Sequence, residues 1–286
     1  MTRTTLRFVL PMLAISAFAQ ANAQVVTVTS PAGTVTNPGG PDMNDTFAYD
    51  RWLRDNVRGG STVGITSTYT HNGDTGSAYL SGTIANTSKA DMEYYFGGQY
   101  VTPFTLGSLS SASYDYLRNS SSTAQAWLTP SLRFMIDNDG NFSTTNDRGI
   151  LVYEPIYNGV SVAATDTWTT ASITGSTNLW WRQYTGGNNV AFNDVDLADY
   201  KSGVTINGQT VNSNTVIYGI SSGIGSGWGG TYDGAIDNIN LQYGESNVTF
   251  AFETAAVVAT PEPASLVLVA TGFAGIVGIA RRRRQG

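Results

Sequence analysis

Residues 235–253 read AIDNINLQYGESNVTFAFE and contain two short stretches in which apolar and polar side chains alternate. In 235–243 the alternation begins at Ile239, and in 247–253 valine and phenylalanine alternate with asparagine, threonine and glutamate. Side chains two positions apart lie on the same face of a strand. Both stretches therefore predict strands with one apolar and one polar face, as in an antiparallel sheet with one solvated side.

The same pattern recurs at 131–137, where three apolar side chains share one face. From 45 to 253 no long stretch has the period of a helix, and short helical pieces are expected only around 50–57 and 194–201. Short alternating runs separated by Gly, Asn, Asp and Ser are typical of antiparallel sheets. The sequence therefore predicts a mainly β protein with a single antiparallel β-sandwich, a jelly roll.

The composition is that of a globular chain with few kinds of catalytic side chain. The 286 residues include no Cys and one His, and 13% are charged. Without Cys there are no disulfides, thiolate nucleophiles or Cys-ligated zinc, and one His leaves little room for Ser-His-Asp catalysis. Residues 24–263 hold 9 basic and 21 acidic residues, a net charge of −12. This charge argues against nucleic-acid binding, and it predicts repulsion of acidic polysaccharide unless a divalent cation bridges the two.

Residues 1–23 predict a secretory signal peptide. Arg3 and Arg7 precede a short apolar run, and Ala21-Asn22-Ala23 is the small-x-small pattern that signal peptidase cuts after Ala23. A buried N-terminal helix is the alternative, and Pro11 argues against it.

The C-terminus predicts a second targeting signal. Pro261, Glu262 and Pro263 precede a 17-residue apolar stretch, 264–280, and four arginines follow it, namely Arg281, Arg282, Arg283 and Arg284. The stretch is long enough for a transmembrane helix, and the positive-inside rule places the rest of the chain outside. This order resembles the PEP-CTERM sorting signal of Gram-negative bacteria. The resemblance implies transient inner-membrane anchoring, cleavage near Pro-Glu-Pro by an exosortase-type protease, and delivery to the cell surface or extracellular matrix. A plain C-terminal membrane anchor is the alternative.

These signals divide the chain into four segments. The signal peptide occupies 1–23, and a Thr/Pro/Gly-rich leader or linker with room for one short strand occupies 24–44. The β-sandwich ectodomain occupies 45–256, and the sorting signal with its helix occupies 257–286.

Short motifs in the ectodomain carry a second resemblance. They lie at 73–80, 113–118, 130–141, 180–181, 225–228 and 234–238. They resemble the ectodomains of other proteins with this sorting signal, and the late Gly-rich turn that leads into Ile236-Asp237-Asn238 also resembles jelly-roll carbohydrate-binding and laminin-G/concanavalin-like modules. The resemblance implies that an Asp on the last strands, Asp237 here, helps to hold a structural calcium with residues near the N-terminus. Those partners would be Asp45 or Asp50.

The residues around Asp237 lead to a related expectation. Asp237 shares strand parity with apolar residues, so its carboxylate is expected to be buried. A buried carboxylate must find a cation, an arginine or several backbone N–H groups.

A second candidate calcium loop lies at 137–147. Asp137, Asp139 and Asn141 stand at alternate positions, Asp147 follows, and oxygen side chains in this arrangement can converge on a hard cation. The spacing is not that of an EF-hand. An ordinary hairpin turn at Asp-Gly is the alternative.

Two aromatic pairs are candidates for stacking on sugar rings. Trp228 and Tyr232 follow a Gly-rich loop and could form a platform, or Trp228 could plug the end of the sandwich. Trp181 and Tyr184 could line a groove, and because Trp180 and Trp181 point to opposite faces, one of the two is expected in the core.

Candidate catalytic residues are few. Glu93 and Glu154 would serve a glycoside hydrolase only if they faced each other across an open groove within roughly 10 Å. His71 is expected on a surface turn. The sequence thus predicts an exported, non-catalytic surface or matrix protein that binds or organises polysaccharide, with structural calcium as its one cofactor candidate. A structural protein without a glycan ligand and a polysaccharide-degrading enzyme stay open.

Overall fold

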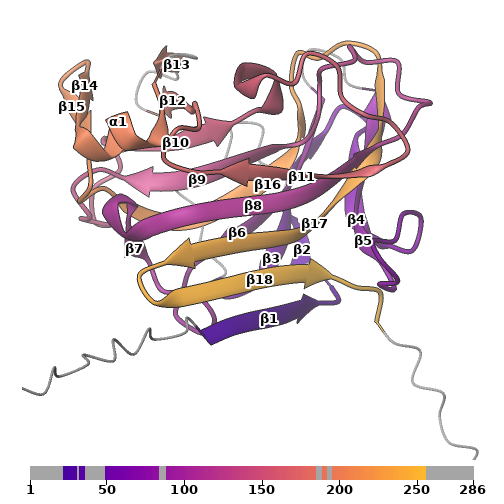
Figure 1. The fold of residues 1–286 in the computed structure, drawn as a ribbon, viewed down its shortest axis with the longest axis horizontal. Helices are drawn as coiled ribbons and strands as arrows, with labels where there is room; N and C mark the ends of the chain where they lie inside the picture. The colour runs from indigo at the N-terminus through magenta and orange to yellow at the C-terminus, as the bar shows by residue number, and fades with distance from the viewer. Residues whose placement is uncertain are drawn as a thin grey trace, which may run out of the picture. The chain divides into compact units, whose positions relative to one another are not determined.

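The computed structural model describes residues 22–30, 32–35, 49–83, 88–184, 189–191 and 195–255. Two β-sheets form a sandwich within the compact unit that ends at Thr254 (Figure 1), which confirms the predicted mainly β fold. Among the described residues, no helix is long and apolar enough to cross a membrane. The predicted sorting helix and residues 1–21 of the predicted signal peptide lie outside the described residues.

The first sheet, sheet A, is organised around one long strand, β17. Its described strands are β1 (Asn22–Val28), β4 (Thr62–Thr66), β5 (Ser77–Thr83), β8 (Leu109–Arg118), β11 (Trp168–Ile173), β17 (Thr231–Tyr243) and β18 (Ser246–Phe252). On one side β17 pairs with β8, which pairs with β11. On the other side β17 pairs first with β5 and then with β18, so the sheet forks along this edge.

The second sheet, sheet B, runs in the order β13-β12-β10-β9-β16-β6-β3-β2, with β7 also on β16. Its described strands are β2 (Ala32–Val35), β3 (Trp52–Arg58), β6 (Lys89–Tyr95), β7 (Phe104–Thr105), β9 (Ser131–Asp137), β10 (Arg148–Tyr153), β12 (Trp180–Gln183), β13 (Asn189–Ala191) and β16 (Val216–Gly225). A short ribbon, β14 (Val204–Ile206) with β15 (Gln209–Val211), and helix α1 (Leu197–Ser202) complete the described regular structure, with 3₁₀ turns at Leu106–Ser108 and Pro155–Asn158.

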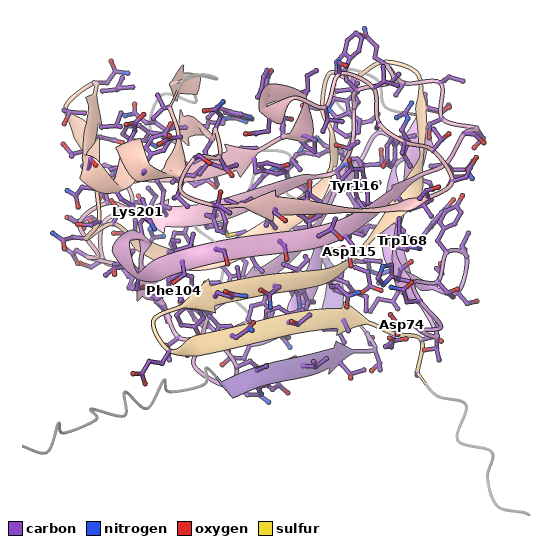
Figure 2. All side chains as sticks on the ribbon, viewed as in Figure 1. Asp74, Phe104, Asp115, Tyr116, Trp168 and Lys201 are labelled. Carbon is purple, nitrogen blue, oxygen red and sulfur yellow. The ribbon has the colours of Figure 1, made fainter. Side chains whose placement is uncertain are left out.

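Aromatic rings from both sheets meet in the core. Trp52 of sheet B packs edge-on against Phe250 and Phe252 of sheet A, with ring centroids 5.3 and 4.9 Å apart. Phe104 stacks on Tyr243 at 4.1 Å, and Figure 2 labels Phe104 near the turn that leads into β8. Each aromatic ring buries a large apolar area, so these contacts help to hold the two sheets together.

The N-terminal segment differs from the predicted linker. Strand β1 pairs with β18 and β2 pairs with β3, both in parallel, so 22–35 supplies a strand to each sheet. Cleavage after Ala23 would leave Gln24 to Val28 of β1 in place, paired with Val248 to Phe252. Among the described strands, the ladders of both sheets are therefore antiparallel except at these two pairs.

One of the two expected helical pieces is confirmed. Helix α1 begins after Asp196, whose side chain accepts a hydrogen bond from the Asp199 N–H. The helix expected around 50–57 is instead strand β3, because this segment pairs with β6 while Trp52 packs between the sheets and Leu53 packs in the apolar cluster on the other face.

The fork in sheet A lies at Asp237 and Asn238. Asn238 has a positive φ of 48°, and the ladder between β17 and β8 is irregular from Asp237 to Asn240. Past the fork, Phe252 lies beyond the β17–β18 ladder, and its N–H donates to the side-chain oxygen Asp237 Oδ1 at 2.8 Å, as does the Asn238 N–H. The buried carboxylate thus accepts hydrogen bonds from two backbone N–H groups, which are one of the three kinds of partner expected from the sequence. Burial and the charges of Asp74 and Glu253 raise the pKa of Asp237 to about 7, although the two hydrogen bonds lower it.

Asp237 should make stability depend on pH. Its pKa is raised from 3.8, so the folded chain keeps this proton where the unfolded chain has lost it. The stabilisation is complete below about pH 4 and is lost as the pH rises to about 7, with a slope of at most about 1.4 kcal/mol per unit. We expect Asp237→Asn, which keeps the Oδ1 acceptor, to flatten the pH profile of the melting temperature between pH 4 and 7. Asp199→Asn, at an exposed carboxylate, is the control, and an unchanged slope in Asp237→Asn would contradict the assignment.

Candidate functional site

A hollow of about 340 Å³ opens where β6 ends, and we call it the aromatic hollow. It is lined by Tyr49, Phe96, Gly97, Pro103, Phe142 and Tyr218. Tyr49 and Phe142 are 53% and 48% exposed, whereas Phe96 and Tyr218 are buried beneath them. Phe142 meets Tyr218 edge-on at 5.9 Å. The hollow therefore combines two exposed rings with a packed aromatic floor.

Asp50 and Gly97 hold Tyr49 at the hollow. The Asp50 N–H donates to the Tyr95 carbonyl at 2.9 Å, and Asp50 Oδ1 accepts from the Gly97 N–H at 3.0 Å. A Cβ on Gly97 would lie 2.4 Å from Asp50 Oδ2 and 2.6 Å from Tyr49 Cβ. The close packing of residues 49–50 against position 97 therefore requires glycine there. Asp50 thus anchors a turn at the hollow, whereas Asp237 bonds the end of β18. The other expected calcium partner, Asp45, lies outside the described residues.

The outer face of sheet B, which points away from sheet A, continues from the hollow. Tyr95 stacks near Tyr218 with ring centroids 6.4 Å apart, and a satellite apolar cluster of Leu53, Met135, Ile150 and Val152 surrounds them. The Arg148 guanidinium lies 5.4 Å from the centre of the Tyr218 ring and 5.8 Å from that of Phe142. Cation–π contacts of this kind fix the tilt of both rings.

Ion pairs occupy the same face, which was expected to be solvated. Arg133 Nη1 donates to Asp91 Oδ1 at 2.7 Å, Lys89 bonds the other oxygen of Asp91, and all three residues are buried. Burial alone would raise the pKa of Asp91, but the charges of Arg133 and Lys89 hold it below its usual range. The polar face at the centre of sheet B is therefore buried and not solvated, so the expectation is wrong there. It can be buried because the opposite charges of Arg133, Lys89 and Asp91 stabilise one another.

Glu93 and Glu154 do not form the groove of a glycoside hydrolase. Glu93 is completely buried, accepts a hydrogen bond from the Tyr95 hydroxyl at 3.0 Å, and has its pKa raised well above the usual range by burial and by the charge of Asp55. Glu154 accepts from Trp180 Nε1 at 3.0 Å, and burial raises its pKa. Neither lines the aromatic hollow, and the buried Glu93 does not face an open groove as the glycoside-hydrolase alternative requires.

The aromatic residues singled out from the sequence lie apart from the hollow. Trp181 is 0% exposed and Tyr232 is also buried, so neither ring offers a face to a sugar, which corrects the stacking prediction for both. Trp181 is thus the core member of the Trp180-Trp181 pair. Trp228 is half-buried and packs edge-on against Tyr232 at 5.6 Å, and Tyr184 is half-buried against the outer face of sheet B.

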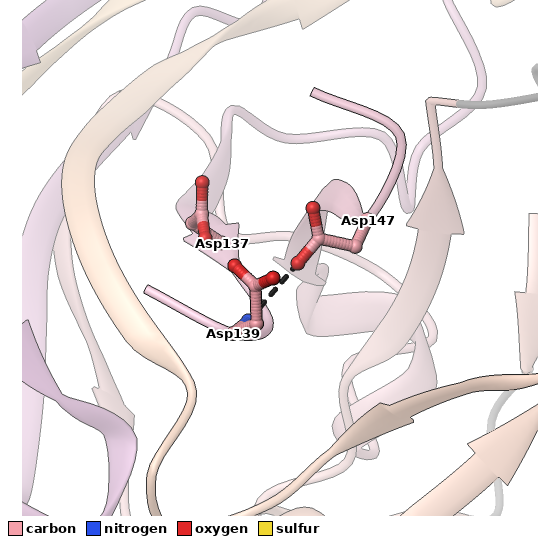
Figure 3. Close-up of side chains that lie close together, drawn as sticks. All are labelled: Asp137, Asp139 and Asp147. Atoms are coloured by element: carbon pink, nitrogen blue, oxygen red, sulfur yellow. Dashed lines mark hydrogen bonds between the residues drawn. The ribbon is translucent and has the colours of Figure 1, made fainter. Parts of the chain in front are cut away.

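The loop between β9 and β10 brings three carboxylates together (Figure 3). One oxygen from each of Asp137, Asp139 and Asp147 lies within 4.8 Å of the others. Asp147 Oδ2 accepts from the Asp139 N–H at 2.9 Å, and Arg148 Nε donates to Asp137 Oδ2 at 3.0 Å. Asn141, the other expected ligand, directs its side-chain oxygen to the Ser143 hydroxyl at 2.5 Å.

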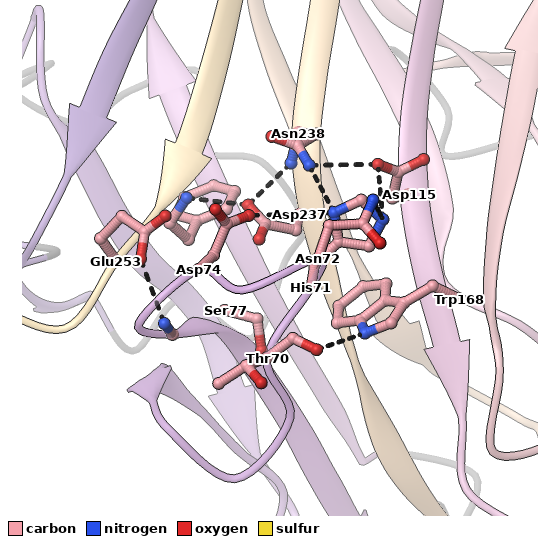
Figure 4. Close-up of polar contacts among 12 residues, drawn as sticks. Thr70, His71, Asn72, Asp74, Ser77, Asp115, Trp168, Asp237, Asn238 and Glu253 are labelled. Atoms are coloured by element: carbon pink, nitrogen blue, oxygen red, sulfur yellow. Dashed lines mark hydrogen bonds and ion pairs between the residues drawn. The ribbon is translucent and has the colours of Figure 1, made fainter.

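A polar network surrounds the fork in sheet A (Figure 4). His71 is largely buried, with Nε2 3.5 Å from Asp115 Oδ2 and Nδ1 3.0 Å from Asn238 Nδ2, and its ring meets Trp168 edge-on at 5.0 Å. His71 thus lies on a turn as expected, but its side chain is largely covered and not on the surface, because the loop packs against β8 and β11. Figure 2 shows Asp115 and Trp168 on this side of the sheet. The network joins three strands and the loop before β5.

Comparison with known protein families confirms the sorting signal. Residues 259–284 match the PEP-CTERM protein-sorting motif. The chain is therefore an exported protein that carries this motif and is sorted at the cell envelope, and the motif implies processing by an exosortase-type protease. No curated protein matches the chain.

Solved structures with a similar fold include carbohydrate-binding modules. One is the family 11 module from Clostridium thermocellum in complex with a β-1,3-1,4-mixed-linked tetrasaccharide, with 14% identity, 74% of this chain and 95% of that chain covered, and a TM-score of 0.36. Another is the family 11 module of the cellulase Lic26A-Cel5E of C. thermocellum, with 16% identity, 75% and 96% coverage, and a TM-score of 0.36. Likeness at this level does not transfer a ligand to this chain.

The buried ion pair should be essential to sheet B. Arg133→Met would remove one of the two cations bonded to the buried Asp91, which keeps Lys89 and the Asn56 amide, and removal of one partner from a buried pair costs about 3–5 kcal/mol. We expect a loss of this size in the free energy of unfolding measured by urea denaturation. Arg51→Met, at an exposed arginine, is the control and should change little. A loss below about 1 kcal/mol for Arg133→Met would mean that this pair contributes little to the fold.

Proposed function

We propose that the ectodomain binds a neutral extracellular polysaccharide without cleaving it, and that a sugar ring stacks in the aromatic hollow. The observation that carries the proposal is the pair of exposed rings, Tyr49 and Phe142, above the buried ring of Tyr218. The C–H faces of sugars pack on aromatic rings, and a volume of about 340 Å³ falls in the range of small-molecule sites.

The electrostatics of the chain support a neutral ligand. Residues 24–263 carry a net charge of −12, which disfavours acidic polymers at a distance. Arg148, which lies against two rings of the hollow, is buried under Phe142 and Tyr218 and is already bonded to Asp137. Recognition in the hollow would therefore depend on stacking and not on ion pairs.

Export and sorting support the same proposal. A protein sorted at the cell envelope by a PEP-CTERM motif meets the polysaccharides of the cell surface and of the extracellular matrix. A structural role without a glycan ligand is the alternative, and the burial of Trp181 and Tyr232 is consistent with it.

The hollow predicts which substitutions should weaken glycan binding. We expect Tyr49→Ala and Phe142→Ala each to weaken binding at least tenfold in affinity electrophoresis through gels that contain neutral polysaccharides, because each removes one stacking face. Both side chains are about half exposed, so the melting temperature should change by only a few degrees.

Tyr157→Ala is the matched control, since Tyr157 is an exposed ring that does not line the hollow. Unretarded migration of the unsubstituted chain in every gel would overturn the proposal in favour of the structural role. Equal retardation of Phe142→Ala and the unsubstituted chain would move the binding site away from the hollow.

A further inference from the structure

We infer that Asp137, Asp139 and Asp147 form a calcium site in the loop between β9 and β10, and that the bound ion fixes the loop that presents Phe142 to the aromatic hollow. The link to the hollow rests on the proposed function, whereas the ion site stands on its own geometry.

The spacing of the three carboxylates suits one ion. Calcium binds its oxygen ligands at 2.3–2.6 Å, so two ligands of the same ion lie at most about 5 Å apart. One oxygen from each of Asp137, Asp139 and Asp147 lies within 4.8 Å of the other two. Figure 3 shows the three carboxylates converging from the two ends of the loop.

Two of these carboxylates have a buried oxygen without a hydrogen-bond partner. Asp137 is 0% exposed, and its Oδ1 accepts no hydrogen bond although Oδ2 is bonded to Arg148. Asp147 Oδ1 is likewise buried and without a partner, while Oδ2 accepts from Asp139 N–H. An unsatisfied buried carboxylate oxygen is costly, and a bound cation is a partner that would offset this cost.

The charge at the loop also matches a divalent ion. Three carboxylates and the single guanidinium of Arg148 leave a formal charge of −2. The donors are all carboxylate oxygens, with no nitrogen or sulfur, which favours calcium or magnesium over zinc or copper. Irregular ligand spacing in a loop favours calcium, because magnesium demands near-ideal octahedral geometry.

The loop connects the ion site to the hollow. Arg148 donates to Asp137 through Nε and to the Phe142 carbonyl through Nη2, both at 3.0 Å. The Phe142 ring also meets the Tyr218 ring of the hollow edge-on, with ring centroids 5.9 Å apart. An ion on Asp137 and Asp147 would draw the two ends of the loop together and so hold Phe142 in place for a ligand.

Calorimetric titration of the purified chain with calcium chloride tests the site directly. We expect a dissociation constant in the range of about 10⁻⁴–10⁻³ M that extracellular calcium modules show, and a melting temperature that rises with calcium and falls with chelator. Asp139→Asn, at an exposed position, should weaken calcium binding at least tenfold without unfolding the chain. Asp147→Asn should do the same, and Asp199→Asn, an exposed carboxylate in α1, should bind as the unsubstituted chain does.

Absence of calcium binding at 10 mM, or equal binding by Asp139→Asn and the unsubstituted chain, would overturn the site. Affinity electrophoresis with calcium and with chelator separates this result from the proposed function. Retardation that weakens with chelator in the unsubstituted chain but not in Asp139→Asn supports the link to the hollow. Equal retardation under both conditions in a chain that binds calcium would overturn that link and leave glycan binding intact.

Discussion

All of sheet A depends on the path of β17. Strands β5, β18 and β8 pair with it directly, and β4, β1 and β11 pair only with those three. Because β5 and β18 share one edge of β17, the strand must change its pairing partner at Asp237 and Asn238. Phe252 lies beyond the β17–β18 ladder, and a buried side-chain carboxylate accepts the hydrogen bond from its N–H at 2.8 Å. A polar group in the core is thus a consequence of the topology.

Sheet B meets a different constraint, because its central strands are buried on both faces. Its outer face holds charges that water cannot solvate, and they are stable only as pairs such as Arg133 with Asp91. The stacked rings of Tyr95 and Tyr218 continue this dry face to the aromatic hollow, where Phe142 and Tyr49 meet solvent. The hollow therefore has a rigid floor on strands and a rim on loops, an arrangement suited to binding.

Local pattern was enough to predict the strands but not their surroundings. The alternation in 131–137, 235–243 and 247–253 predicted β9, β17 and β18, and the parity of Asp237 predicted its burial. Arg133 and Asp91 are 42 residues apart, so no local sequence pattern indicates that they pair. The outer face was therefore expected to be solvated. The hollow likewise joins rings from distant segments, whereas the prominent Trp181 belongs to the core. Only the aspartates at 137–147 lie close enough in sequence for their convergence to have been expected.

The position of that loop connects the charge of the chain to the hollow proposed to bind its ligand. A domain with a net charge of −12 repels acidic polymers, and three aspartates behind Phe142 place negative charge next to the hollow itself. Arg148 offsets one of them and also lies against the Phe142 and Tyr218 rings, so the aromatic rim and the acidic loop share a single cation. A change in the charge of the loop therefore acts on the Phe142 and Tyr218 rings through Arg148. A divalent ion there would both remove the local repulsion and stiffen the rim, because electrostatics and packing meet at the same guanidinium.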